Sequence, residues 1–404
     1  MHRIFTSWVW LLIQLLLLLL ASGILYLSLG AFRDPSQSAH AMLSSVVWAT
    51  FGPHLVLLSA IGLVLGAVAS RKKLTWLSGS LLGVSLGALV STSYITASIV
   101  TAVEQAGGKI SILTTLQLQS MQANGPDKWI QLPGEDSETA RIAIYRPEHE
   151  AMAPVLVYIH GGGFKTGSIT ETDRDLRWFA DRGWLVFSLG YRLWTEQQAT
   201  WQLAPQDVYC AAVWVQANAS RYGGDPSRLA MLGDSAGGNL ALNLAYQTAH
   251  DDMVSACPGP ALQPAAVVVQ YPAVDPLAIY QHGYPVAGFE PTTLVAGYLG
   301  GDPYQFPERV AAVSSYSYLN FDAPTTLIFA PEKDGLVPSW SVYRFADYAR
   351  LAGVDVELVR IPFASHIYNQ MAANSLGNQA RLSITERFLQ QQGLAFNQKN
   401  DDRR

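Results

Sequence analysis

Charged residues are scarce in this chain. Asp, Glu, Lys and Arg make up 14% of its 404 residues, against roughly 25% in an average soluble domain. The net charge of −5 leaves no basic footprint, so nucleic acid is not an expected partner. Two cysteines are too few for a disulfide scaffold or for a multi-cysteine zinc or iron–sulfur module. Half of the residues are hydrophobic, which excludes a disordered chain.

The charge that is present is distributed unevenly along the chain. Residues 1–103 carry a net charge of +4, so the remaining residues carry −9. A leucine-rich stretch lies near the N-terminus, and by itself the segment 1–21 could be a cleaved signal peptide. Two further uncharged stretches of spanning length argue against that interpretation. We therefore expect a membrane segment over 1–105, with helices at about 8–29, 43–70 and 74–103.

The basic cluster Arg71–Lys73 predicts the orientation of this segment. It separates the second and third apolar stretches, and short loops rich in Lys and Arg stay in the cytoplasm. The N-terminus with Arg3 then also lies inside, and everything after the third helix lies on the outer face. The sequence predicts a multi-pass membrane protein that contacts the lipid bilayer and carries an extracytoplasmic soluble domain.

Small residues and one histidine mark the membrane segment. The spacing of Gly62–Gly66 and of Gly79, Gly83 and Gly87 would let helices approach closely, although glycine is also common in membrane helices. His54 is either a functional group within the membrane or a marker of its interface.

The composition changes after the membrane segment. We expect a linker over 106–125, a soluble domain over 126–392 and a polar tail over 393–404. Apolar runs typical of strands occur at 141–145, 154–160, 184–189, 229–232, 265–271, 325–330 and 354–361. Helical patterns between them lie at 173–182, 204–221, 237–250, 339–351 and 379–391. This alternation predicts an α/β domain with a mostly parallel sheet flanked by helices. Residues 276–322, rich in Tyr, Pro and Gly, interrupt it and are expected to form a lid.

A serine is flanked by glycines in Gly233-Asp234-Ser235-Ala236-Gly237. The motif follows the apolar run 229–232 and precedes a helical pattern. Glycines at both ends permit a sharp strand-to-helix turn that exposes the serine hydroxyl. The start of the helix would place N–H groups beside a developing negative charge. Ser235 is therefore the candidate nucleophile.

A glycine loop follows an earlier strand. The apolar run 154–160 leads into His160-Gly161-Gly162-Gly163-Phe164, and glycines let backbone N–H groups face a substrate oxygen. A tetrahedral intermediate needs such donors. An ordinary flexible turn would have the same composition, but both motifs occur directly after apolar strands.

A serine nucleophile needs a base and an acid that orients the base. Only His366 occupies a loop after a late strand, so it is the candidate base by elimination. Asp334 follows the run 325–330 and is our choice for the acid, with Glu332 and Asp275 as alternatives. The order serine, acid, histidine is that of α/β-hydrolases.

These motifs together resemble a known family. HGGGF, GGDPSRLAMLGDSAGGNLAL, and the late Asp-Gly-Leu-Val-Pro and Ser-His are similar to the hormone-sensitive-lipase-like and BD-FAE-like carboxylesterases over about 125–392. The resemblance implies an α/β-hydrolase fold with the triad Ser235, Asp334 and His366. It also implies an oxyanion hole from the N–H groups of Gly162, Gly163 and Ala236, and no cofactor or metal. Many lipase-like members have Asp-Pro-Leu where this chain has Asp-Gly-Leu.

Five other residues admit structural interpretations. Asp207 and Asp225 are expected to serve turns and helix starts. Cys210 and Cys257 could form a disulfide on an oxidising side of the membrane or remain two separate buried thiols. Asn218 begins a single glycosylation pattern.

The leading hypothesis is a membrane-tethered serine carboxylesterase that acts on a small-molecule or lipid-like ester. An acyltransferase would use the same triad to pass the acyl group to a sugar or lipid hydroxyl. A catalytically silent membrane scaffold is the third hypothesis. The sequence leaves the oligomeric state and the acyl-chain length open.

Overall fold

The chain divides into two units, and each contains segments that are distant in the sequence. The computed structural model describes residues 2–72, 75–132, 141–148, 152–249, 257, 259–260, 262–286 and 288–394. The first unit, called the helical unit here, comprises Met1–Gln119, Pro331–Lys333 and Ile361–Ala380. The second, called the sheet unit, comprises Ser120–Ala330, Asp334–Arg360 and Arg381–Arg404. Most of the expected polar tail, 395–404, lies outside the described residues.

Three long apolar helices dominate the helical unit. They are α1 (His2–Ala31), α3 (Trp48–Lys72) and α4 (Trp76–Gln105), and each is long and apolar enough to cross a membrane. Large apolar side chains such as Leu12, Leu16 and Leu19 point outward from α1, as lipid-facing residues do. Shorter helical turns in this unit are η1 (Pro35–Gln37), α2 (Ala39–Ser45) and α5 (Ile112–Thr115).

The expectation of three apolar helices is confirmed, with one change of boundary. The second long helix begins at Trp48 rather than at residue 43 because a separate short helix, α2, precedes it. Ser38 caps α2 by accepting a hydrogen bond from the N–H of Ala41. Of the basic cluster between the second and third helices, Lys73 lies outside the described residues.

Two of the noted glycines bring α3 against α4. A Cβ on Gly62 would lie 2.8 Å from Ser85 Oγ, and one on Gly66 would lie 3.2 Å from the backbone N of Leu82. A Cβ on Gly83, in contrast, would meet none of the described residues within 4 Å. Close approach therefore explains Gly62 and Gly66, whereas Gly83 has no such role in the described chain.

The sheet unit is built around eight strands. Their order is β1-β2-β4-β3-β5-β6-β7-β8; the pairs from β4 to β7 are parallel, whereas β2 pairs antiparallel with both β1 and β4. The strands are β1 (Lys128–Gln131), β2 (Arg141–Tyr145), β3 (Ala153–Ile159), β4 (Leu185–Leu189), β5 (Gly224–Asp234), β6 (Ala266–Gln270), β7 (Thr325–Pro331) and β8 (Val356–Ile361). The central strands β3 and β6 are buried along their whole length, as expected for a sheet covered on both faces.

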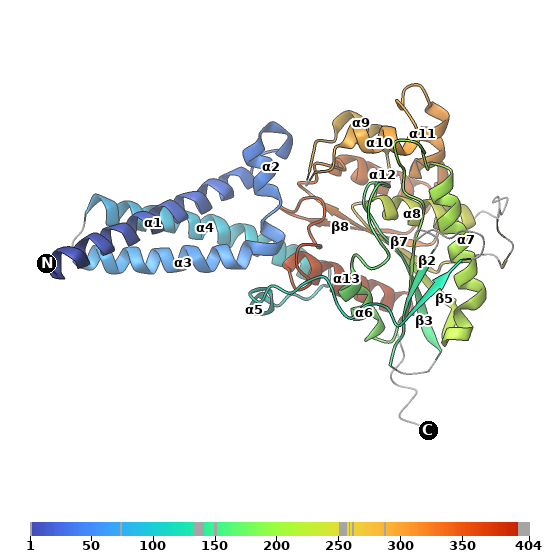
Figure 1. Cartoon of the computed structure of the whole chain (residues 1–404), viewed down its shortest axis with the longest axis horizontal. Helices are drawn as coiled ribbons and strands as arrows, with labels where there is room; N and C mark the ends of the chain where they lie inside the picture. Colours follow the sequence, from blue (N-terminus) through green and yellow to red (C-terminus); the bar gives the residue numbers. More distant parts are fainter. Residues whose placement is uncertain are drawn as a thin grey trace. The chain divides into compact units, whose positions relative to one another are not determined.

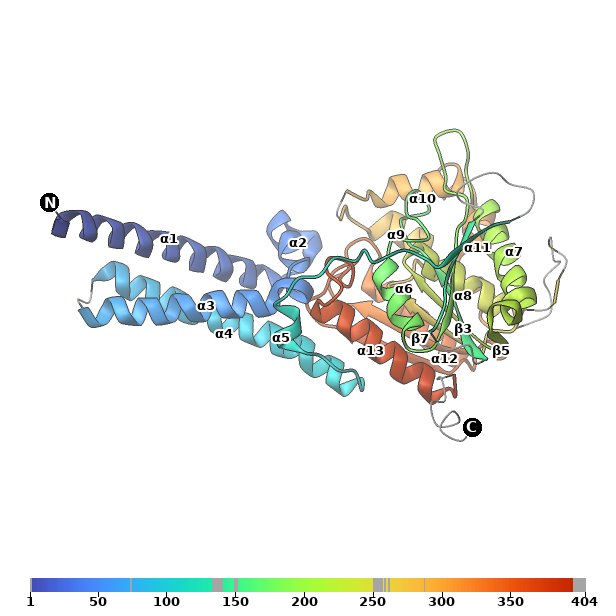
Figure 2. The same cartoon turned by 60° about the horizontal axis from the view of Figure 1, so that its bottom comes forward.

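Helices cover both faces of this sheet (Figures 1 and 2). One group is α6 and α13, which share a buried ion pair, and the other includes α7, α8 and α12. Their bounds are α6 (Asp173–Ala180), α7 (Leu203–Asn218) with η3 (Ala219–Tyr222), α8 (Ala236–Thr248), α12 (Ser339–Leu351) and α13 (Leu376–Gln391). The predicted mostly parallel α/β fold is confirmed.

The interval expected to form a lid is helical. It contains α9 (Pro276–His282), α10 (Pro291–Leu299), α11 (Pro307–Val313) and η4 (Ser315–Tyr318). Each of the three α-helices begins with proline, which suits the first turn because that position needs no N–H donor.

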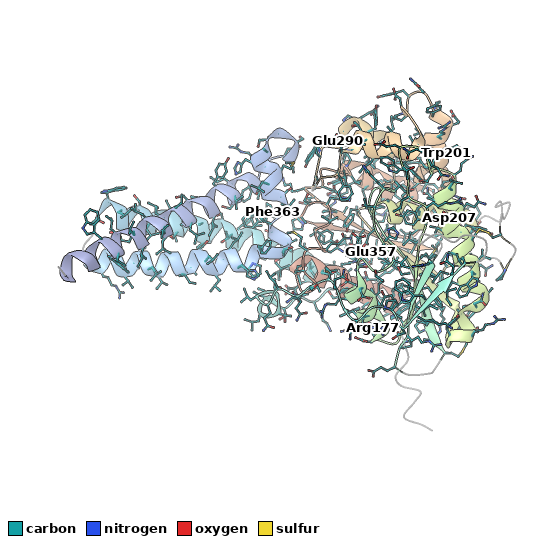
Figure 3. The ribbon with its side chains drawn as sticks, viewed as in Figure 1. Arg177, Trp201, Asp207, Glu290, Glu357 and Phe363 are labelled. Carbon is teal, nitrogen blue, oxygen red and sulfur yellow. A yellow bond between two sulfur atoms is a disulfide. The ribbon has the colours of Figure 1, made fainter. Side chains whose placement is uncertain are left out.

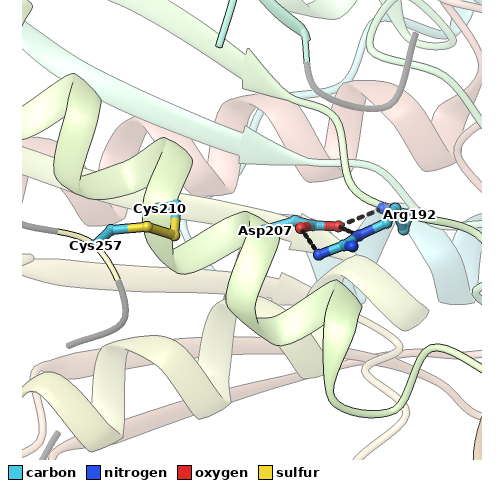
Figure 4. The surroundings of a disulfide bond; sticks show 4 residues. All are labelled: Arg192, Asp207, Cys210 and Cys257. Atoms are coloured by element: carbon cyan, nitrogen blue, oxygen red, sulfur yellow. Dashed lines mark hydrogen bonds and ion pairs between the residues drawn. A yellow bond between two sulfur atoms is a disulfide. The ribbon is translucent and has the colours of Figure 1, made fainter. Parts of the chain in front are cut away.

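A disulfide joins α7 to the segment after α8. Cys210 and Cys257 are bonded with a Cα–Cα distance of 5.4 Å, so the alternative of two separate thiols is wrong (Figure 4). One turn earlier on α7, Asp207 forms an ion pair of 2.6 Å with Arg192. Asp225 accepts hydrogen bonds from the N–H and hydroxyl of Ser227, and the hydroxyl bond lowers the pKa of its carboxyl. Asp225 thus serves a turn, as expected, whereas Asp207 lies within α7 and binds Arg192 instead of a helix start.

Candidate active site

Ser235 lies at a sharp turn between a strand and a helix. It follows the last residue of β5 and precedes the first residue of α8, with φ 54° and ψ −114°. Few non-glycine residues adopt such a positive φ, because the Cβ then crowds the backbone. Hydrogen bonds hold the turn: the N–H of Ser235 donates to Gln270 O at 2.9 Å, and its carbonyl accepts from Asn239 N and Ala273 N.

The glycines around Ser235 are required by close packing. A Cβ on Gly233 would lie 2.3 Å from the carbonyl oxygen of Gly237. A Cβ on Gly237 would lie 2.2 Å from the carbonyl oxygen of Ile159, at the end of β3. Any side chain at either position would push α8 away from the sheet and so open the turn.

The glycine loop passes directly over this turn. A Cβ on Gly161 would lie 2.9 Å from Asp234 O and 3.4 Å from Ser235 Cβ. Gly162 and Gly163 have φ of 106° and 62°, a region that favours glycine. The glycine loop and the serine motif, which are far apart in the sequence, therefore meet in the fold.

Three backbone N–H groups at this meeting point have no hydrogen-bond acceptor among the described residues. They belong to Gly162, Gly163 and Ala236, and no hydrogen bond from any of them is found within the part of the chain that the structure describes. Ala236 is buried and the two glycines are half-buried, and backbone donors that are shielded from water normally have an acceptor. Their arrangement is consistent with a site that accepts a negatively charged oxygen.

An apolar pocket opens at Ser235. Its space is about 440 Å³, part of it open to solvent, and Gly163 and Ala236 line it beside Ser235. The expected lid supplies much of the remaining lining, which consists of Phe164, Ala273, Pro276, Ile279, Leu294, Val295, Tyr298, Leu336 and Val337. Such a pocket with few polar groups suits an uncharged organic substrate.

Asp334 lies in a turn after β7, close to this pocket in sequence and space. Its Oδ1 accepts hydrogen bonds from the N–H groups of Leu336 (3.0 Å) and Val337 (2.9 Å), both of which line the pocket. The two alternative acids are placed differently. Glu332 is exposed, and Asp275 caps α9 while forming an ion pair with Arg344 at 2.9 Å.

His366 is buried in the loop that follows β8, with 3% of its surface exposed. This loop belongs to the helical unit, whereas Ser235 and Asp334 belong to the sheet unit. The structure therefore brings Ser235, Gly163 and Ala236 into one pocket, with Asp334 on an adjoining turn, and places His366 in a different unit. Of the other histidines of the soluble domain, His149 and His250 lie outside the described residues.

A buried charge network lies behind the serine, and sequence reasoning missed it. Asp234 is fully buried and accepts a hydrogen bond from Tyr158 Oη at 3.0 Å. Arg381 of α13, also fully buried, lies 3.5 Å from Asp234 and 2.6 Å from Asp175 of α6. Burial alone would lower the pKa of Arg381, but the two carboxylates more than compensate and raise it. No local pattern joins these positions, because they are distant in the sequence.

His160 supports the glycine loop as a neutral side chain. Its ring stacks on Tyr191 with 4.4 Å between centroids, and its Nδ1 lies 2.8 Å from Gly161 O. Tyr191 Oη donates to the carbonyl of His160 at 2.9 Å. Burial lowers the pKa of His160 to about 4. The ring therefore stays uncharged and donates from Nδ1 near neutral pH.

The fold and this site define an α/β-hydrolase. Residues 142–347 match the BD-FAE family. Ethyl acetate hydrolase of Pseudomonas putida is 32% identical over 262 residues, 60% of this chain and 76% of that protein. Esterase LipQ of Mycobacterium tuberculosis is 30% identical over 228 residues, 54% of this chain and 51% of that protein. This chain thus spans about half the length of LipQ.

Solved structures agree on the fold. Esterase 2 of Thermogutta terrifontis, phosphonylated by sarin, has a TM-score of 0.53 and 24% identity, covering 66% of this chain and 98% of that one. The chain belongs to the BD-FAE family, within the carboxylesterase group of α/β-hydrolases. The resemblance expected from the sequence motifs is confirmed.

The pKa of His160 predicts a pH-dependent stability. The His160 imidazole binds a proton near pH 6.5 in the unfolded chain but only near pH 4 in the folded chain, because burial lowers its pKa. Stability is therefore fully present above the unfolded pKa and falls between the two values, by up to about 3 kcal/mol. Urea unfolding of the detergent-solubilised full chain at about pH 7 and about pH 5 measures this loss.

Two variants test whether the pH dependence of stability comes from His160 or from other titrating groups. His160→Asn removes the titration and should flatten the change in unfolding free energy between the two pH values. His282→Asn, at an exposed histidine of α9, should leave it as in the unmodified chain. An unchanged pH dependence in His160→Asn would contradict the assignment.

Proposed function

We propose that this chain is a membrane-tethered serine carboxylesterase whose nucleophile is Ser235. The chain is a carboxylic ester hydrolase by its family and its relatives. One observation carries the finer proposal: a serine held at φ 54° at the mouth of an apolar pocket, next to N–H groups that find no acceptor in the described chain. That combination suits acyl transfer through a tetrahedral intermediate.

The proposed reaction proceeds in two halves. His366 takes the proton of the Ser235 hydroxyl, and Oγ attacks the carbonyl carbon of the ester. The oxyanion is bound by the N–H groups of Gly162, Gly163 and Ala236, each worth about 3–4 kcal/mol of barrier by analogy with known oxyanion holes. His366 returns the proton to the departing alcohol. Water then attacks the acyl-enzyme, with His366 again as the base, and releases the acid.

Asp334 is proposed to orient His366 and to stabilise its protonated form. Its turn is fixed by the two hydrogen bonds from Leu336 and Val337, so its carboxylate has a defined direction. Asp334 is buried beside the pocket, whereas neither alternative acid is suited to this role. Glu332 is exposed, and Asp275 forms an ion pair with Arg344.

The pocket supports a substrate with a compact apolar acyl group. Leu294, Val295 and Tyr298 of α10 close it on the lid side, and the ring of Tyr298 stacks on Phe164 with 3.7 Å between centroids. This rigid aromatic wall limits the length of chain that fits. A short acyl group also agrees with the name of the related ethyl acetate hydrolase.

The three apolar helices support attachment to a bilayer, and the basic cluster supports an outward-facing sheet unit. The disulfide adds independent support for the orientation, because such bonds persist in oxidising compartments and are rare in the cytoplasm. A tethered enzyme of this kind would meet small amphiphilic esters or ester-bearing lipids outside the cell.

Ester hydrolysis tests the nucleophile. Detergent-solubilised full chain should hydrolyse p-nitrophenyl esters with short acyl groups and lose activity steeply with longer ones. Ser235→Ala should lower kcat by at least about 10⁴-fold, because the nucleophile is gone. Ser220→Ala, at an exposed serine of η3, is the matched control and should keep full activity. Hydrolysis retained by Ser235→Ala would contradict the proposal.

The state of the cysteines in cells tests the orientation. With the sheet unit outside, a maleimide of high mass should label neither cysteine in acid-quenched, denatured protein until a reductant is added. Cys257→Ser should expose one reactive thiol without reductant and so calibrate the shift on a gel. Two labels on the unmodified chain before reduction would place the unit on the cytoplasmic side.

A further inference from the structure

The loop that carries His366 is held at both of its ends by N-terminal residues. It runs from Pro362 to Ser375, between β8 and α13. One contact lies at Phe363, three residues before His366, and the other at Asn374. All the partners belong to the helical unit, as the loop itself does.

The first contact is a cluster of three aromatic rings. The ring of Phe363, which is labelled in Figure 3, lies edge-on to Phe32, 5.4 Å between centroids, and to Tyr94, 6.2 Å between centroids. Phe32 and Tyr94 also contact each other at 6.0 Å. Phe32 follows the end of α1 and Tyr94 belongs to α4, so the turn after α1 and the helix α4 both contact the loop at Phe363.

The backbone around His366 needs such support. Phe363 has φ 57° and Ile367 has φ 54°, so two left-handed conformations flank the histidine. Non-glycine residues keep this conformation only where their surroundings dictate it. The carbonyl of Ala364, between them, accepts a hydrogen bond from Lys333 N at 2.8 Å.

Lys333 extends the contact to the segment before Asp334. Its Nζ donates to Arg33 O at 3.1 Å, in the turn after α1. The positive charge of Lys333 also contributes, after the hydrogen bonds from Ser36, to the lowered pKa of Asp34. The turn after α1 thus contacts both the histidine loop, through Phe32, and the residue that precedes Asp334.

The second contact is the side chain of Asn374, which is 5% exposed. Its Nδ2 donates to Thr114 O at 2.6 Å and also to Gln117 O, and its Oδ1 accepts from Gln119 N at 2.9 Å. One amide therefore satisfies three backbone groups of the segment that joins α4 to the sheet unit. Without it, two carbonyls and one N–H would lose this partner.

We infer that the N-terminal part of the helical unit positions the loop of the catalytic histidine, with Asn374 and Phe32 as positioning residues. The inference rests on the proposed role of His366 as the base. A tether that only holds the enzyme at a membrane would need no contact with this loop. Here the loop is held at one end by the rings of Phe32, just after α1, and Tyr94 of α4, and at the other end by the segment 111–119.

The kinetics of Asn374→Ala in the full chain test this inference. A misplaced base slows the chemical step without altering the pocket, so kcat should fall at least about tenfold while KM stays within about twofold. Arg174→Ala is the matched control, because Arg174 of α6 donates to the carbonyls of Ser120 and Gln122 just beyond the same segment. This variant loses the two hydrogen bonds to Ser120 and Gln122 but keeps the hydrogen bonds between Asn374 and the segment 111–119, so kcat should not change.

Variants at Phe32 provide a second test that does not depend on Asn374→Ala folding. Phe32 is half exposed, so its replacement should leave the fold intact. Phe32→Ala should lower kcat at constant KM, and Phe32→Tyr, which keeps the ring, should restore it. A fall in KM and kcat together, or no rescue by tyrosine, would contradict a positioning role.

Parallel assays of Ser235→Ala and His366→Ala separate this inference from the proposed function. Inactive Ser235→Ala and His366→Ala beside fully active Asn374→Ala and Phe32→Ala would overturn the inference and leave the triad standing. An active His366→Ala would overturn the proposed base and the inference with it.

Discussion

The backbone of Ser235 is the constraint on which the rest of the site depends. A positive φ at a non-glycine residue costs on the order of 1–3 kcal/mol and persists only when the surroundings dictate it. Here β6 supplies the acceptor for the Ser235 N–H, and glycines at 233 and 237 allow α8 to start against the end of β3. The same turn places the hydroxyl, the first N–H of α8 and the mouth of the pocket together.

The charge network behind that turn connects it to one of the two helical layers, the one formed by α6 and α13. Asp234 and Arg381 are both fully buried, and Arg381 also binds Asp175 of α6. Breaking one partner of a buried pair costs about 3–5 kcal/mol, because the other charge is left without compensation. The network therefore links β5, α6 and α13 directly behind the nucleophile. It makes the position of Ser235 depend on the C-terminal helix as well as on its own strand.

Much of the fold could be predicted from the sequence, because long apolar runs and helical periods are local signals. Each of the seven expected strands is present, and the serine and glycine motifs meet as their strand-end positions suggested. The edge strand β1 was missed because its four residues are largely exposed and lack a buried face. The partners of Arg381 and of Asn374 lie far away in the chain, and no pattern in one sequence records such pairs. Composition alone also left the pairing of the cysteines open.

The helical unit and the sheet unit divide the proposed triad between them, because the segment that holds His366 groups with the apolar helices. The proposed mechanism nevertheless depends first on Ser235 as the nucleophile. Labelling the full chain with a fluorophosphonate, followed by peptide mass mapping, tests that claim most directly. We expect a single covalent adduct on the peptide that contains Ser235, with hydrolysis lost in proportion to labelling. An adduct on another residue that abolishes hydrolysis, or full labelling of Ser235 with hydrolysis retained, would contradict it.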